Sequence, residues 1–177
     1  MFSAKTYAAR RNMLRTKIGS GIVLFPGNPL SPNNYPNNAY YFRQDSSFLY
    51  YFGLNVPSLA GLIDADTGEE ALYGDDFTVE DIIWTGPQPT LRELGAKVGI
   101  AATYPLSELE KRLRKAISLG RKIHFLPPYR GETKLWLSSL LGIKPALLHD
   151  YKSVDLMFAV QLHKSSLLYL LPDCLFL

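Results

Sequence analysis

Residues 21–27 read Gly-Ile-Val-Leu-Phe-Pro-Gly, a short run of β-branched and aromatic side chains closed by a proline and a glycine. Such side chains favour extended backbone, and the run is too short and too tightly bounded to be a helix. It therefore predicts a buried strand over residues 21–25.

The segment before this strand is expected to form an amphipathic surface helix. Ser3 is a favourable N-cap residue, and Gly19 is a favourable stop after about Lys17. The stripe predicted to face the core consists of Tyr7, Leu14 and Ile18. The cations predicted on the remaining faces are Lys5, Arg10, Arg11, Arg15 and Lys17.

Further strands are predicted after this first strand in the chain. Residues 28–38 hold three prolines and five asparagines, which favour turns. The aromatic residues 46–52 (SSFLYYF) predict a strand that ends at Gly53, and residues 59–63 and 71–73 flank the turn 64–68 as a hairpin. Residues 122–126, just before Pro127-Pro128, predict one more strand.

Helices are predicted between and after these strands. Thr90-x-x-Glu93 and Ser107-x-x-Glu110 are both typical of capping boxes, and the helices that they begin should end near Gly99 and Gly120. Residues 132–141 predict another helix. Helices interleaved with short apolar strands indicate an α/β domain whose sheet is covered on both faces.

Composition narrows the class of protein. A chain of 177 residues that is 47% hydrophobic suits one globular domain. The net charge of +3 falls short of the concentrated basic field of a nucleic-acid-binding protein. No run approaches the roughly 18 apolar residues of a membrane span. Cys174 is the only cysteine, so no intrachain disulfide can form, and a cytoplasmic location is expected.

Charge is unevenly distributed along the chain. Basic residues gather in the first helix and between Lys111 and Lys122, whereas eight of the 16 acidic residues lie between Asp64 and Asp81. These groups are interpreted as solvated faces, with self-association of unlike patches or an anionic partner as the alternatives.

The sequence offers no clear catalytic or metal-binding set. The three histidines, His124, His149 and His163, are scattered, with no partner at helical spacing. The acidic pairs at residues 64–66 and 75–76 are better explained as turn residues than as ligands of a hard cation. No nucleophile motif or phosphate-binding loop is present. We therefore expect no catalytic residue and no metal in this chain.

Two aromatic motifs remain distinctive. In residues 40–53 (YYFRQDSSFLYYFG), Arg43 is expected to be held by a carboxylate or by carbonyl groups. Trp84 precedes a Gly-Pro turn at Gly86, where it fits either a core plug or a loop anchor that fills a pocket of a partner.

Together these motifs resemble the N-terminal domain, of the creatinase or aminopeptidase P type, of Xaa-Pro aminopeptidases and prolidases, the pita-bread metallopeptidases. The residues that carry the resemblance are Arg10, Arg11, Phe42, Arg43, Gln44, Asp45, Ser46, Phe48, Tyr51, Gly53, Pro57, Trp84 and Gly86. The resemblance covers about residues 5–155, and its arginine-glutamine box is typical of the aminopeptidase P branch.

The resemblance implies a three-layer α/β/α fold with a mixed sheet and a ribonuclease H-like motif. It implies structural roles for Arg43, Gln44, Asp45, Phe48, Gly53 and Gly86. It also implies a following pita-bread catalytic domain that holds two manganese ions for metal-assisted hydrolysis. Those ligands would lie beyond residue 177, so this chain is expected to be inactive alone.

The role implied for the domain is to mediate oligomer contacts and to form part of the entrance of the active site, which restricts access to it. Trp84 matches a family tryptophan that reaches toward a neighbouring subunit's active site, and Asn37 matches a polar loop position near that entrance, where a carboxylate can occur. The implied partners are the catalytic domain of the same polypeptide, further copies of the chain, and peptides with proline at the second position.

Residues 156–177 depart from the family pattern. This apolar segment carries only Lys164 and Asp173 as formal charges, at the point where the catalytic domain would begin. We interpret the chain as a domain over residues 1–155 plus an atypical tail, and favour a fragment of a longer protein over a natural truncation. Two other functions stay open: a stand-alone peptide- or protein-binding module without peptidase activity, and an independent hydrolase with an unrecognised site.

Overall fold

The structure is a computed structural model that describes residues 2–35, 38–150, 156–157 and 160–161. In chain order the elements are α1 (Ala4–Ile18), β1 (Ile22–Pro26), α2 (Ser46–Phe52), β2 (Ala60–Asp64), β3 (Glu70–Tyr73), α3 (Val79–Thr85), α4 (Leu91–Lys97), β4 (Ala102–Tyr104), α5 (Leu106–Ser118), β5 (Ile123–Phe125), α6 (Gly131–Leu141) and the 3-10 helix η1 (Pro145–Leu147). The predicted α/β class is confirmed.

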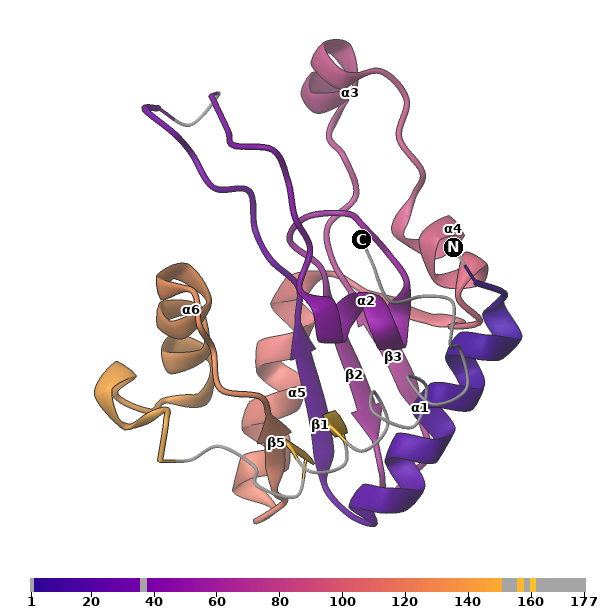
Figure 1. Ribbon diagram of the computed structural model, residues 1–177, viewed down its shortest axis with the longest axis vertical. Coiled ribbons are helices and arrows are strands. Elements are labelled where there is room, and N and C mark those ends of the chain that lie inside the picture. The colour runs from indigo at the N-terminus through magenta and orange to yellow at the C-terminus, as the bar shows by residue number, and fades with distance from the viewer. Residues whose placement is uncertain (1, 36–37, 151–155, 158–159, 162–177) are drawn as a thin grey trace.

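The five strands form one mixed sheet in the order β4-β3-β2-β1-β5. Leu24 of β1 pairs with Leu62 of the antiparallel β2 on one side and with Phe125 of the parallel β5 on the other. The strands β2 and β3 form the predicted antiparallel hairpin, and β3 pairs with β4 in parallel. Four strands therefore run in one direction and only β2 runs against them, so the loops after β1 and β3 leave the same end of the sheet (Figure 1).

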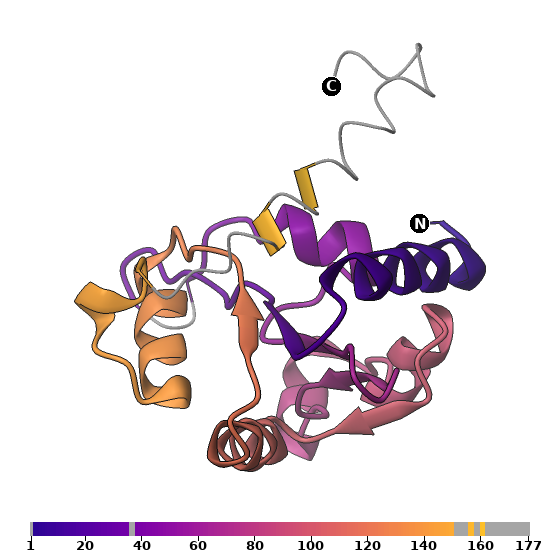
Figure 2. The ribbon, with the colours of Figure 1, turned by 90° about the horizontal axis from the view of Figure 1, so that it is seen from below.

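Helices cover both faces of this sheet, as the three-layer prediction requires. Successive side chains of a strand point to opposite faces. Val23 and Phe25 of β1 belong to the core under α1 and α2, whereas Ile22 and Leu24 belong to the core under α5 and α6. Figure 2 shows α1 and α2 on one side of the strands and α5 on the other.

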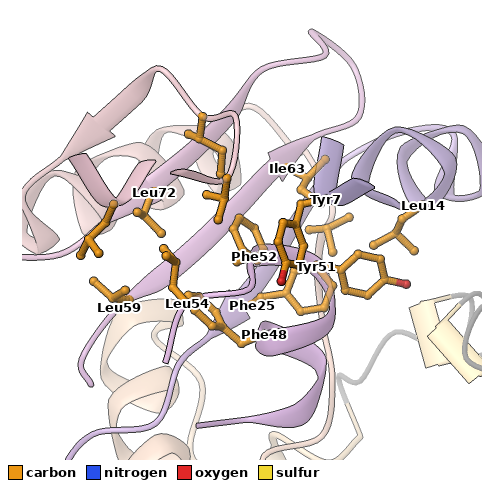
Figure 3. Close-up of a cluster of buried hydrophobic side chains, with 14 of the residues drawn as sticks. Tyr7, Leu14, Phe25, Phe48, Tyr51, Phe52, Leu54, Leu59, Ile63 and Leu72 are labelled. Carbon is orange, nitrogen blue, oxygen red and sulfur yellow. The ribbon is translucent and has the colours of Figure 1, made fainter. Parts of the chain in front are cut away.

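Aromatic rings pack together within the core under α1 and α2 (Figure 3). The ring of Phe25 lies 4.9 Å from that of Tyr51 and 5.9 Å from that of Phe52, between ring centroids, and Phe48 stacks on Phe52 at 5.0 Å. Ring pairs at these separations add to the free energy gained from burial alone. These ring contacts fix α2 against β1, the strand that lies between β2 and β5 in the sheet.

The prediction of a strand over residues 46–52 is wrong, because this segment is the helix α2. Asp45 caps it through Oδ1, which accepts hydrogen bonds from the backbone N–H groups of Ser47 and Phe48 at 2.8 and 2.9 Å. Phe48, Tyr51 and Phe52 recur at helical spacing and are fully buried. The aromatic content suggested β structure, but the cap and this spacing favour the helix.

The start of α5 also differs from the prediction. No side chain near Ser107 caps this helix, whose N-cap residue is Pro105. The N–H group of Leu106 instead donates to Asp75 Oδ1 at 3.1 Å, and Glu110 pairs with Arg114 one turn later in α5. The capping box of Thr90 and Glu93, by contrast, is confirmed at the start of α4.

Several other elements follow the sequence closely, and three were not predicted. The predicted helices at residues 3–17 and 132–141 and strands at residues 21–25 and 122–126 correspond to α1, α6, β1 and β5. The short α3 and β4 and the 3-10 helix η1 were missed. No helix within the described residues is long and apolar enough to span a membrane.

Arg11 is fully buried, contrary to the expectation that it faces solvent with the other cations of α1. Its Nε donates to Glu70 Oε2 at 2.7 Å, and its two terminal nitrogens donate to the carbonyl groups of Tyr51 and Val98 at 3.0 Å each. These two carbonyls lie at the C-terminal ends of α2 and α4, where helices leave acceptors unpaired. One guanidinium thus joins three helices and the sheet.

The predicted tail lies mostly outside the described residues, as does the predicted boundary at residue 155. Within it, Leu156 and Val160 are buried in the core under α1 and α2.

Asp64, at the end of β2, is the centre of an ion-pair cluster. Arg121 donates to both of its carboxylate oxygens at 2.6 and 3.0 Å, and Arg112 lies 3.4 Å away. Burial raises the pKa of Asp64, but hydrogen bonds from Arg121 and from the N–H groups of Thr67 and Asp66 outweigh burial and hold this pKa below its ordinary value of 3.8. The cluster ties the β2–β3 hairpin to the end of α5.

Replacing Asp64 by Asn is expected to lower the free energy of unfolding at neutral pH by about 1–3 kcal/mol. Because the folded-state pKa is the lower one, the carboxylate stabilises the fold fully above the unfolded-state pKa. This stabilisation is lost as pH falls through the folded-state value, so the cost of the substitution should shrink in acid. Urea unfolding at pH 7 and pH 3, with Asp150→Asn at an exposed position as the control, measures the difference. An equal cost at both pH values would contradict this account of the cluster.

Candidate functional site

Loops that could carry function gather at the end of the sheet where β1, β3, β4 and β5 finish. In open α/β sheets, binding sites usually form outside the carboxyl ends of the strands. Two long segments project from this end in the same direction (Figure 1). We name them the first arm (residues 28–44, after β1) and the second arm (residues 75–90, after β3).

Gln44 holds the base of the first arm. Its side chain is only 3% exposed, and its Nε2 donates to the carbonyl of Val56 at 2.7 Å. Its Oε1 accepts from the N–H groups of Asn28 at 2.6 Å and Asp45 at 2.9 Å. Because Asn28 and Gln44 lie at the two ends of the arm, this amide closes the loop at its root.

The outer part of the first arm is a narrow ribbon with exposed tyrosines. Pro32 and Ala39 form an isolated antiparallel bridge, and the N–H group of Tyr40 donates to the carbonyl of Ser31 at 2.9 Å. Tyr41 is 97% exposed. Asn37, the predicted entrance residue, lies outside the described residues.

The rest of the arginine-glutamine box lies at the foot of this arm. Asp45 caps α2, and Phe48 is buried in the aromatic core. Gly53 ends α2 in the left-handed conformation, at φ 68°, and a Cβ there would lie 2.1 Å from Cζ of Tyr7. These three residues fix the helix from which the arm emerges.

Arg43 differs from expectation. Its side chain is exposed and makes no hydrogen bond or ion pair with any described residue, although its carbonyl accepts from Asn28 Nδ2 at 2.9 Å. The carboxylate or carbonyl partners expected for the guanidinium are therefore absent from the described part of the chain.

Two aspartates brace the root of the second arm. Asp75 Oδ1 accepts from the N–H group of Leu106 at the start of α5, and Asp76 Oδ1 accepts from that of Leu91 at the start of α4 at 2.5 Å. Carboxylates at helix N-termini accept hydrogen bonds from otherwise unpaired N–H groups and interact favourably with the positive end of the helix dipole. This acidic pair therefore anchors the second arm to two helices.

The tip of the second arm is the short helix α3. A capping box between Thr78 and Asp81 begins it, and Gly86 ends it at φ 75°, with an N–H bond to the carbonyl of Ile82 at 2.8 Å. Trp84 is 83% exposed, and its neighbours Val79 and Ile83 are 77% and 74% exposed. The core-plug interpretation of Trp84 is therefore wrong, and the loop-anchor alternative is the one compatible with this exposure.

Sequence reasoning missed two residues that join the first arm to the segment after β5. Asn28 Nδ2 donates to the hydroxyl of Tyr129 at 3.2 Å, and Arg130 donates to the carbonyl of Pro29 at 3.3 Å and to the hydroxyl of Ser31. Both follow the Pro-Pro turn at the end of a predicted strand, which was the available signal.

The described residues contain no group of three or more His, Cys, Asp or Glu side chains placed to hold a metal ion. His124 is buried, with Nε2 3.0 Å from the carbonyl oxygen of Ser20, and His163 lies outside the described residues. The first arm presents exposed tyrosines and the cationic Arg43, whereas the second arm presents the exposed apolar side chains of α3 together with the acidic Glu80 and Asp81.

Comparison with known proteins shows which family this chain belongs to and which solved structures share its fold. The sequence model of the family described as aminopeptidase P, N-terminal domain, matches residues 7–144, more than half of the chain. The chain belongs to this family. The aminopeptidase P N-terminal domain is also the fold seen in solved relatives. Aminopeptidase P of Escherichia coli in a low-pH form aligns with a TM-score of 0.66 at 20% identity, over 80% of this chain and 33% of that one. The Pseudomonas aeruginosa aminopeptidase aligns with a TM-score of 0.67 at 19% identity, over 84% and 34%.

Curated relatives of this aminopeptidase P N-terminal domain are peptidases by name. A probable Xaa-Pro aminopeptidase of Aspergillus flavus is 22% identical over 149 residues, which are 84% of this chain and 26% of that protein. An uncharacterized peptidase of Saccharomyces cerevisiae is 27% identical over 111 residues, 63% of this chain and 21% of that protein. The chain thus spans about a fifth to a quarter of the length of these relatives.

Proposed function

We propose that this domain is the non-catalytic N-terminal part of a manganese-dependent Xaa-Pro aminopeptidase. It mediates oligomer contacts and shapes the access of peptides with proline at the second position. The names of the relatives and the short share of their length that the chain matches support the proposal. The catalytic domain of the same polypeptide and a cytoplasmic location are part of it.

In this proposal the chemistry belongs to the rest of the polypeptide. A bound metal pair lowers the pKa of a water molecule and polarises the scissile carbonyl. Under the proposal this domain contributes no step of the hydrolysis. The described residues hold no group of three or more His, Cys, Asp or Glu side chains placed for a metal ion. The contribution of the domain is to contact neighbouring subunits and to limit which peptides reach the active site.

The observation that carries the proposal is the exposed apolar side of α3. Val79, Ile83 and Trp84 all face solvent on a projecting arm, and the root of that arm is fixed by Asp75 and Asp76. Exposed apolar groups gathered in this way mark contact surfaces, and tryptophan is one of the residue types enriched at their energetic centres. A second copy of the polypeptide is the proposed partner.

Replacing Trp84 by Ala is expected to leave the free energy of unfolding within about 0.5 kcal/mol, because the side chain is exposed. The same change should weaken self-association, which light scattering across a concentration series measures. Leu135→Ala, at a position 64% exposed on α6, is the matched control. Unchanged association of the Trp84 variant, or an equal loss in the Leu135 variant, would remove α3 from the proposed contact.

A further inference from the structure

A cavity of about 710 Å³ opens beside the first arm, away from the exposed helix α3. It lies between that arm and the segment that joins β5 to α6. The lining residues that matter here are Tyr40, Tyr41, Arg43, Tyr129, Arg130 and Glu132. Its volume is within the range of about 300–1,000 Å³ that is usual for small-molecule sites.

The cavity carries one net positive charge among its described lining residues. Arg43 has no partner among the described residues, so its guanidinium is available to a ligand. Arg130 is committed to other groups, because its guanidinium donates to the carbonyl of Pro29 and the hydroxyl of Ser31, and its Nε lies 3.8 Å from a carboxylate oxygen of Glu132. Two guanidinium groups and one carboxylate therefore leave a single positive charge, which suits a ligand with one negative charge.

Further hydrogen-bond donors border the same space. The helix α6 begins at Gly131 with no side-chain cap, so its first turn presents unpaired backbone N–H groups. A smaller cavity of about 40 Å³ shares Asn28, Tyr129 and Arg130 with the large one and reaches Thr133. Thr133 is only 8% exposed, and its hydroxyl has no partner among the described residues. A buried hydroxyl without a partner is unusual, and in the smaller cavity a bound water molecule or ion would pair with it.

We infer that this cavity binds a carboxylate carried on a compact, ring-bearing body, such as the C-terminal residue of a short peptide or a free aromatic acid. The planar fork of Arg43 matches a carboxylate in a two-bond geometry. The tyrosines supply flat apolar surface for the ring. The inference concerns a binding site inside this chain, and it does not depend on the proposed function.

Isothermal titration of the 177-residue chain with N-acetylphenylalanine tests the inference. The acid should bind with a dissociation constant in the millimolar range or tighter, and its uncharged amide should bind at least tenfold more weakly. Arg43→Gln should weaken binding of the acid by a similar factor, whereas Arg92→Gln, at an exposed position on α4, should not. Arg43→Lys, which keeps the charge without the fork, should fall between the wild type and Arg43→Gln.

One further ligand, Gly-Gly-Phe, identifies the source of the carboxylate. Tighter binding of Gly-Gly-Phe than of N-acetylphenylalanine assigns the site to peptide ends, and the reverse order assigns it to free acids. Four results would overturn the inference. They are equal binding of acid and amide, unchanged binding in Arg43→Gln, stronger binding of inorganic phosphate, or no binding of the acid at about 10 mM, roughly tenfold above a dissociation constant of about 1 mM. Circular dichroism of each variant separates loss of binding from loss of fold.

Discussion

Replacing Arg11 by Ala is expected to lower the free energy of unfolding by about 3–5 kcal/mol, the usual cost of removing one partner from a buried ion pair. The change leaves the Glu70 carboxylate and the carbonyl groups of Tyr51 and Val98 without their shared donor. It also leaves a cavity where a fully buried side chain was. Urea unfolding at neutral pH measures the loss.

Lys5→Ala on the same helix is the control, because Lys5 is exposed and should tolerate the change within about 0.5 kcal/mol. A cost for Arg11→Ala below 1 kcal/mol, comparable to an exposed pair (about 0–1 kcal/mol), would show that the guanidinium is solvated rather than buried between α1, α2 and α4.

Replacing Gly53 by Ala is expected to cost about 2–4 kcal/mol, the sum of left-handed strain and overpacking. The residue has φ 68°, and the added Cβ would meet the ring of Tyr7 at 2.1 Å. Gly142→Ala is a closely matched control, since Gly142 also ends a helix at φ 68° but a Cβ there meets nothing within 4 Å. The difference between the two variants isolates the contact of α1 with α2.

Thermal unfolding of the two glycine variants gives this difference directly. Gly142→Ala should lose only about 1–2 kcal/mol from backbone strain. Equal losses in both variants would mean that Tyr7 moves away at no cost, so that the packing of α1 on the end of α2 is loose.

The parts of the fold that could be predicted from the sequence are those set by residues close together in the chain. The run at residues 21–25 became β1 because it is apolar and bounded, and the helix at Thr90 formed where its capping box indicated. The start of α5 was misjudged because its capping carboxylate, Asp75, lies 31 residues earlier in the chain. Such a cap depends on the tertiary structure and leaves no local pattern.

Two misjudged segments did carry a usable signal. Tyr7, Arg11, Leu14 and Ile18 share one helical stripe, so the spacing alone placed Arg11 among core residues. Asp45 and Gly53 likewise bracket α2 as its N-cap and C-cap. In both cases residue type was given more weight than position.

The candidate site was predicted less completely than the fold. Trp84 was selected from its motif, but its exposure on a projecting helix depends on how the second arm returns to α4 and α5. Tyr129 and Arg130 join the first arm across about 100 residues of sequence, a contact that only the parallel pairing of β1 with β5 brings about. Asn37 stays a prediction.

The most direct test of the proposed non-catalytic role is to measure metal binding and peptidase activity of the purified 177-residue chain in one experiment. The chain is incubated with manganese and a tripeptide with proline at its second position, and bound metal is counted after desalting. We predict no cleavage above the blank and no stoichiometric manganese, because in the proposed function this domain supplies contact surface and the rest of the polypeptide supplies the hydrolytic centre. Turnover above the blank, or one or more manganese ions retained per chain, would contradict it.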